Sequence, residues 1–207
     1  MLTAGSVTGS DTAGGSVALL GGNGLSESGT GGDIILEAGS ANGASSSAMG
    51  GGMNLTAGAS IDGDGGAVHL NSGTSESGTT GTLILETADG CGGTGGMTVS
   101  TGFASTSDAG QMLIQTGSAS DGAAGSVSIS AGSGDSGLGG AILLKGGSST
   151  DETGGRVQLL SGSATNSVSG SIELNTSDAS SGDSGDVLIA TGDASGNSGD
   201  VWLTTGM

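Results

Sequence analysis

The stretch that decides the fold reads Gly125-Ser126-Val127-Ser128-Ile129-Ser130-Ala131-Gly132. It consists of a glycine, two aliphatic residues separated by one polar residue, a small residue, and a second glycine. We number the positions from the first glycine, which is position zero. Positions two and four are then aliphatic, position six is small, and position seven is usually glycine. The pattern returns along the whole chain, so an internal repeat has to be settled before any other feature is interpreted.

Thirteen units of this kind follow one another in the 207 residues. Successive units begin 14 or 15 residues apart, except for early spacings of 17 and 19. Their first glycines are Gly15, Gly32, Gly51, Gly66, Gly81, Gly95, Gly110, Gly125, Gly140, Gly155, Gly170, Gly185 and Gly199. The two wide spacings predict longer, irregular loops at residues 22–31 and 39–50.

Aliphatic residues at positions two and four alternate with other residues, which is the period of a β-strand. We therefore expect these two rows to point inward and the residues between them to point outward. A unit of 15 residues is too short for a strand plus a helix or for a self-sufficient hairpin. Stacked copies about 4.8 Å apart would bury the rows and pair the backbones. The sequence thus predicts an all-β, single-domain parallel β-solenoid (β-helix) of about 13 coils with a 15-residue repeat, covering residues 1–207.

Position six shares the inward parity, and many units carry threonine there, which predicts a buried ladder of stacked hydroxyl groups. The glycine at position seven is expected to turn a corner with positive φ, because glycine adopts that conformation without strain. The chain begins and ends within a repeat, so we expect it to be a segment of a longer array.

The charge of the chain is strongly acidic. Twenty Asp and Glu residues stand against Lys145 and Arg156 alone, which gives a net charge of −18. Nucleic acids and anionic membranes require a basic patch. We therefore expect no nucleic-acid partner. No apolar run reaches the ~18 residues of a membrane helix, so no membrane insertion is expected either.

The sequence provides no set of residues for catalysis, and we expect the chain not to be an enzyme. His69 is the only histidine and falls at the outward position three, and Cys91 is the only cysteine. A lone cysteine excludes an internal disulfide and a cysteine-based metal cluster. No catalytic residue, cofactor-binding residue or metal ligand is therefore assigned, and no cofactor is expected.

Two alternatives to a purely structural role remain open at the level of sequence. The acidic residues do not form one column, but the pairs Asp178/Asp193 and Asp186/Asp200 lie about one coil apart in the predicted solenoid and could share a cation. This is the hypothesis of a cation-stabilised repeat module. The other alternative is an ice-binding (antifreeze) solenoid, because ranked threonines on a flat β face can bind ice; here most threonines fall on the inward parity.

Position three is the one outward row that is rich in large apolar side chains, and such density is typical of an interaction surface. We predict an interaction face formed by Ile35, Ile84, Leu113, Leu143, Leu188 and Trp202. The predicted partner is a second copy of the chain, by face-to-face pairing or by end-to-end stacking; a surface or ice is a further candidate ligand.

The units from Ser184 to Gly196 and their copies resemble the Gly/Ser/Thr-rich repeat arrays of large surface or extracellular proteins of microbes and algae, and of phage tail-fibre regions. The resemblance covers nearly the whole chain. It implies a non-enzymatic structural or adhesive module: a rod-like spacer or surface-binding segment of an extracellular or cell-surface protein. It carries no functional residues to transfer, and no signal peptide is visible in this segment.

Overall fold

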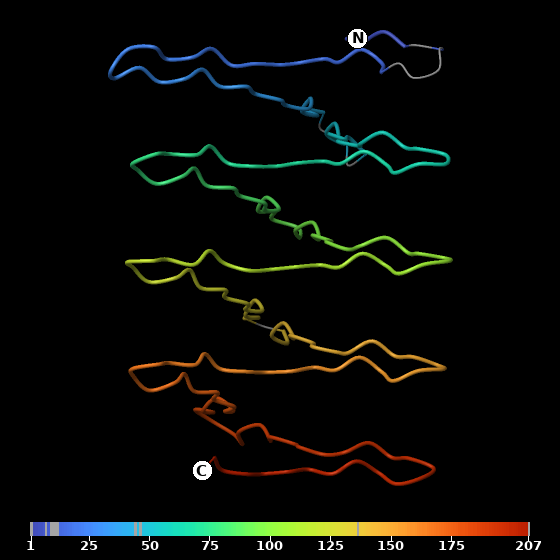
Figure 1. The fold of residues 1–207 in the computed structure, drawn as a ribbon, viewed down its shortest axis with the longest axis vertical. Helices are drawn as coiled ribbons and strands as arrows, with labels where there is room; N and C mark the ends of the chain where they lie inside the picture. The colour runs from blue at the N-terminus through green and yellow to red at the C-terminus, as the bar shows by residue number, and fades with distance from the viewer. Residues whose placement is uncertain are drawn as a thin grey trace. The chain divides into compact units, whose positions relative to one another are not determined.

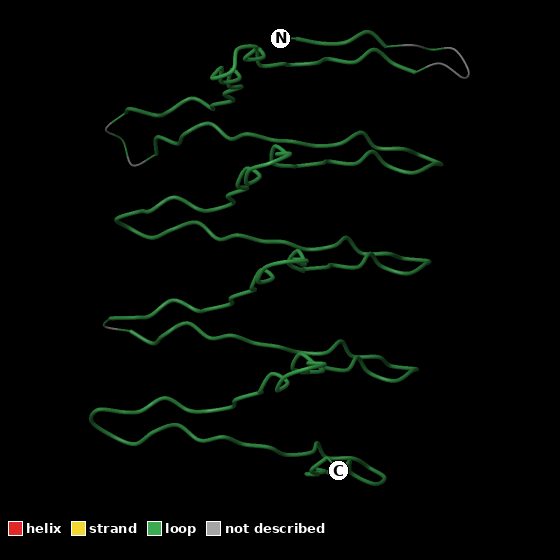
Figure 2. Ribbon diagram, turned by 60° about the vertical axis from the view of Figure 1, so that its left-hand side comes forward, coloured by secondary structure: helices red, strands yellow, loops and turns green. Residues whose placement is uncertain are grey.

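The computed structural model describes residues 2–6, 8, 13–43, 45, 47–135 and 137–206. By compactness the chain divides into an N-terminal part, Met1–Ser100, and a C-terminal part, Thr101–Met207. Neither part contains a helix or a strand among the described residues, and Figure 2 draws all of them as loop. The prediction of an all-β parallel β-solenoid is therefore wrong, and with it the β-solenoid and β-helix description of the chain.

Each part repeats one simple arrangement, an extended stretch followed by a loop that doubles the chain back (Figure 1). The extended stretch corresponds to positions one to six of a unit, and the loop runs from position seven to the first glycine of the next unit. A backbone hydrogen bond closes the loop: the N–H of that first glycine donates to the carbonyl of the position-seven residue. We call this hydrogen bond the closure. Nine closures are formed among the described residues, for example from Gly66 to Gly58 at 2.9 Å.

A side chain at the first glycine of a closure would be in tight contact with the residues at positions six and seven. A Cβ added to Gly155 would lie 2.9 Å from the backbone nitrogen of Gly147, and one added to Gly140 would lie 3.1 Å from the Cβ of Ala131. The long loops predicted at 22–31 and 39–50 end in the same bond, from Gly32 to Gly22 and from Gly51 to Gly39, each at 2.8 Å.

Inside the loops, serine at position nine has a recurring role. Its hydroxyl oxygen accepts a hydrogen bond from the backbone N–H three residues later: from Gly63 to Ser60, from Gly78 to Ser75, and from Glu152 to Ser149. Such a turn satisfies one backbone donor locally. The prediction of positive φ at position seven is wrong. The described glycines with positive φ are Gly93 and Gly182, both at position twelve, nearer the end of the loop.

The aliphatic rows are not buried, and no described hydrophobic side chain forms a core. The expected order of exposure nevertheless survives. Side chains at position two are 47–61% exposed, and those at position four are 58–72% exposed apart from Leu203. The large apolar residues at position three are 68–87% exposed. The alternation therefore specifies an extended chain with two unequal sides.

The solenoid prediction failed because alternation implies an extended backbone but does not supply the strand that it pairs with. Among the described residues, backbone hydrogen bonds are limited to the closures and two short turns, Gly29 to Ser26 and Ala48 to Ser45. Without lateral pairing there is no inward side, so the hydroxyl ladder is also absent: the position-six threonines are exposed. Ordering 49 glycines is costly in conformational entropy, and two aliphatic residues per unit offset little of that cost.

We predict that Gly155→Ala weakens its closure, whereas Gly147→Ala does not. The new methyl group at residue 155 would meet the Gly147 nitrogen at 2.9 Å, but a Cβ at residue 147 meets nothing within 4 Å. Loss of the hydrogen bond, worth about 1 kcal/mol, should raise the amide exchange rate of residue 155 about fivefold. Residue-resolved hydrogen exchange measures this rate, and equal rates in the two variants would contradict the close approach.

A second prediction concerns the aliphatic rows. Ile129 is 69% exposed, so Ile129→Asp should change local stability by no more than about 0.5 kcal/mol, as should Ser128→Asp beside it. The measurement is the amide exchange rate of Gly140, whose closure follows this segment. A large acceleration in Ile129→Asp alone would show that position four is buried after all.

Candidate interaction surface

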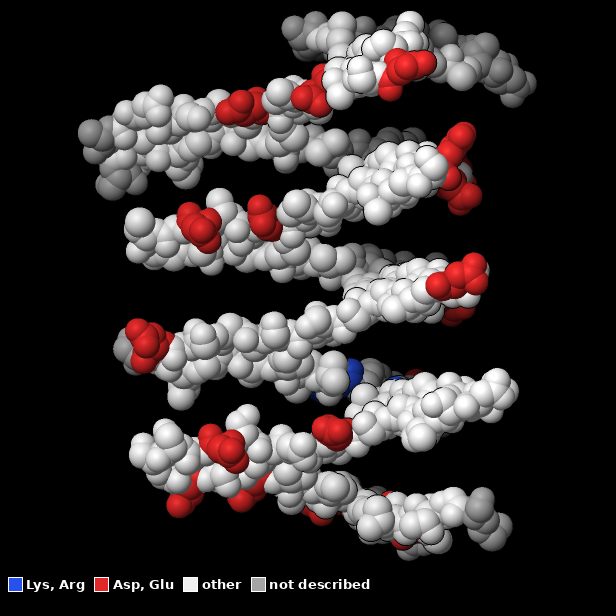
Figure 3. All heavy atoms as spheres, turned by 90° about the vertical axis from the view of Figure 1, so that its left-hand side faces the viewer, with Lys and Arg blue, Asp and Glu red and all other residues white. Residues whose placement is uncertain are grey.

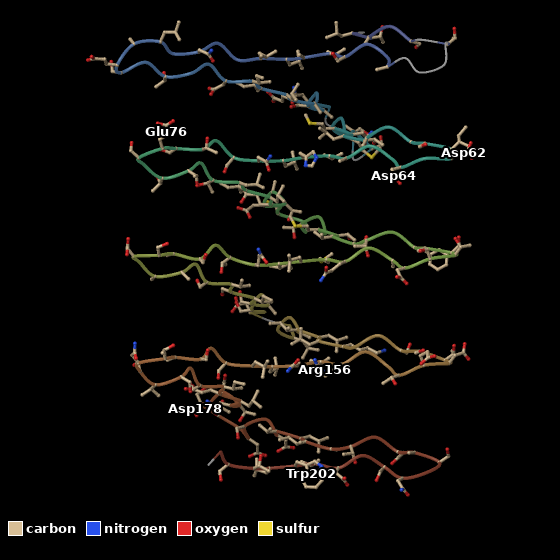
Figure 4. The ribbon with its side chains drawn as sticks, viewed as in Figure 1. Asp62, Asp64, Glu76, Arg156, Asp178 and Trp202 are labelled. Carbon is tan, nitrogen blue, oxygen red and sulfur yellow. The ribbon has the colours of Figure 1, made fainter. Side chains whose placement is uncertain are left out.

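The six predicted interaction residues all lie on extended stretches with their side chains exposed. Ile35 and Ile84 belong to the N-terminal part; Leu113, Leu143, Leu188 and Trp202 belong to the C-terminal part. Figure 4 shows Trp202 on such a stretch, whereas Asp62 and Glu76 lie on loops that point in opposite directions. The structure thus leaves each of these side chains exposed to a partner.

The acidic side chains are distributed over many separate places, which Figure 3 shows as small red groups on the face that it draws. Within the described residues, no group of three or more His, Cys, Asp and Glu side chains is close enough to hold a metal ion. The pairs Asp178/Asp193 and Asp186/Asp200 are not part of such a group. His69 and Cys91 are exposed, and the described part of the chain encloses no cavity.

The closures fall into two classes, and position six distinguishes them. Where that residue is Gly, Ala or Ser, the N–H to carbonyl distance is 2.8–3.0 Å. We call these tight closures. Their position-six residues are Ala4, Gly21, Ala38, Ala57, Ser72, Ala131, Gly146 and Ser161. Four of the five half-buried residues of the described chain, Gly21, Ala38, Ala57 and Gly146, are in this set, so half of the tight closures are also among the best-packed places.

Where position six is threonine, the closure is long or missing. We call these open closures, and they follow Thr87, Thr101, Thr116, Thr176 and Thr191. From Gly125 to Gly117 the distance is 3.4 Å. At Gly95, Gly110, Gly185 and Gly199 no backbone hydrogen bond is formed within the described residues. Three of the five open closures keep glycine at position seven, so a missing glycine there does not explain the class.

The side chain of threonine accounts for the opening. A Cβ added to the facing first glycine would meet the threonine methyl group 3.8–4.0 Å away at four of the open closures, those of Gly95, Gly110, Gly185 and Gly199. At the fifth, the Thr116 hydroxyl donates to the Gly125 carbonyl at 3.0 Å, beside the long bond from the Gly125 N–H to the Gly117 carbonyl. The threonine side chain is therefore the nearest group to the first glycine of an open closure, whereas the position-seven backbone nitrogen lies 2.9–3.4 Å from the same built Cβ in a tight closure.

Sequence reasoning missed this role of threonine because it assigned position six to a buried core. The signal was present in the order of the residues. Threonine occupies position six in two runs of consecutive units, residues 81–117 and 170–206, and we call these the open stretches. Elsewhere position six is Gly, Ala or Ser.

Comparison with known proteins adds no relative from which function could be transferred. No protein-family model, no curated protein and no solved structure matches the chain significantly. None of the described residues forms a helix that is long and apolar enough to cross a membrane.

Proposed function

We propose that the chain is a non-enzymatic structural repeat module, a spacer or adhesive segment of an extracellular or cell-surface protein. The observation that carries this proposal is the recurrence of one locally closed unit that exposes apolar side chains. Each closure joins residues only about half a unit apart, as from Gly140 to Gly132, so the hydrogen bonds that hold the repeat are local. Repeat arrays have this local, additive character.

The exposed apolar row supports the adhesive part of the proposal. Leu143 is 83% exposed and Leu188 is 87% exposed, far from the burial that either residue has in a folded core. Repetition multiplies such weak sites, because a second contact made by the same chain is intramolecular. The acidic charge of −18 keeps the segment solvated and favours uncharged or cationic surfaces over anionic ones.

We predict that the chain adsorbs to a methyl-terminated monolayer and that position three dominates this binding. The test variant replaces Ile84, Leu113, Leu143 and Leu188 with serine. The matched control replaces four exposed leucines outside the row, Leu20, Leu25, Leu138 and Leu160, with serine. A quartz microbalance should show at least a threefold loss of adsorption in the test variant and a smaller loss in the control. Equal losses would contradict a specific row.

The same protein also tests the ice-binding alternative. Thermal hysteresis at micromolar protein concentration would contradict the adhesive proposal and support ice binding. The described residues form no paired sheet that would hold the threonines in ranks. The proposal expects freezing to be unaffected.

A further inference from the structure

The open closures leave backbone groups that nothing in the described chain satisfies. The N–H groups of Gly95, Gly110, Gly185 and Gly199 make no backbone hydrogen bond there, and neither do the extended stretches on either side. Unpaired N–H and C=O groups along an extended chain are a template for another strand. The open stretches are therefore the places where the backbone is most available for pairing.

The exposed surface of the chain is large enough to accommodate a partner. It exposes 20222 Å², whereas a folded monomer of 18.9 kDa exposes about 8,300 Å² by the usual scaling with mass. A stable dimer needs only about 1,200–2,000 Å² of buried surface in total. Covering a small part of the exposed chain would supply that area.

We propose that each open stretch pairs edge to edge with an open stretch of a second copy of this chain, as an added β-strand. The repeat itself favours a second copy over another partner. When the central position three of one copy lies opposite position three of the other, aliphatic residues face aliphatic residues in either direction: two faces two in parallel pairing, and two faces four in antiparallel pairing. The unit spacings are 14 then 15 residues in 81–117 and 15 then 14 in 170–206. Successive segments therefore stay in phase when like stretches pair in parallel or when unlike stretches pair antiparallel.

Charge sets the conditions for this pairing. The open stretch at 81–117 carries three acidic residues, Glu86, Asp89 and Asp108, whereas the one at 170–206 carries six: Glu173, Asp178, Asp183, Asp186, Asp193 and Asp200. Two copies repel each other, and salt screens that repulsion beyond about 10 Å at 0.1 M. Pairing therefore strengthens with salt, and the stretch at 81–117 pairs at lower salt than the stretch at 170–206.

This inference goes beyond the spacer or adhesive role and does not depend on it. Adsorption in the preceding experiment depends on side chains at position three, whereas pairing between copies depends on backbone groups released by threonine at position six. Either one can fail while the other holds.

The experiment compares two sets of substitutions at the same five positions. The closing variant carries Thr87→Ala, Thr101→Ala, Thr116→Ala, Thr176→Ala and Thr191→Ala, which removes the branched side chains and allows tight closures. The control carries valine at the same positions and keeps the branch without the hydroxyl group. Sedimentation velocity at salt concentrations from low to 0.5 M measures the fraction of dimer. The infrared amide I band measures the content of paired β-strand. A reductant is present because Cys91 is exposed.

The wild-type chain and the valine control are expected to dimerise as the salt concentration rises and to gain infrared strand signal. The closing variant should dimerise with at least tenfold lower affinity. A gain-of-function variant with Ala38→Thr, Ala57→Thr and Ala131→Thr should dimerise more tightly. A wild-type chain that stays monomeric at all salt concentrations would overturn the proposal. A closing variant that pairs as tightly as wild type would also overturn it. So would a valine control that loses pairing, because the threonine hydroxyl group, and not the opened backbone, would then be responsible.

Discussion

The close approach of two backbones at each closure is the constraint on which the rest of the structure depends. The first glycine of one unit reaches the carbonyl of position seven in the unit before it at about the length of an ordinary hydrogen bond, as at 2.8 Å from Gly155 to Gly147. A Cβ on the first glycine of a tight closure would lie 2.9–3.4 Å from its nearest neighbours, and these closures carry a small residue at position six. This close approach accounts for the glycine at position zero and the small residue at position six, although no hydrophobic side chain of the described residues is buried.

The sequence allowed the repeat to be predicted, but not what the repeat does. Glycine at positions zero and seven and the small residue at position six marked the unit boundaries, and alternation such as Val127 and Ile129 marked an extended stretch. Pairing could not be deduced, because Ile129 is equally suited to a buried sheet and to an exposed chain. The prediction of a hydroxyl ladder at Thr87, Thr101 and Thr116 was wrong for the same reason. Alternation shows on which side of an extended chain a residue lies, but the residue is buried only if another segment packs against that side.

The residue at position six distinguishes the two kinds of closure: a small residue accompanies a tight closure, and threonine accompanies an open one. Alanine at residue 131 accompanies a closure of 2.9 Å, while threonine at residue 116 accompanies one of 3.4 Å and a bond from its own hydroxyl. The two closures differ at position six, where Ala131 carries a methyl group and Thr116 carries a larger, branched side chain. Units of nearly identical sequence can therefore differ in how many backbone groups they leave free to pair with a partner. This difference requires no change in the aliphatic rows or in the charge of position six.

Residue-resolved amide hydrogen exchange of the dilute, low-salt monomer tests the closure most directly. The account predicts slowed exchange at first glycines of tight closures, such as Gly66, Gly140 and Gly170, and exchange near the random-coil rate at Gly95, Gly110, Gly185 and Gly199. Amides of the aliphatic stretches should also exchange rapidly. Uniform protection of those stretches together with all first glycines would contradict it, because such a pattern requires a paired sheet within one chain.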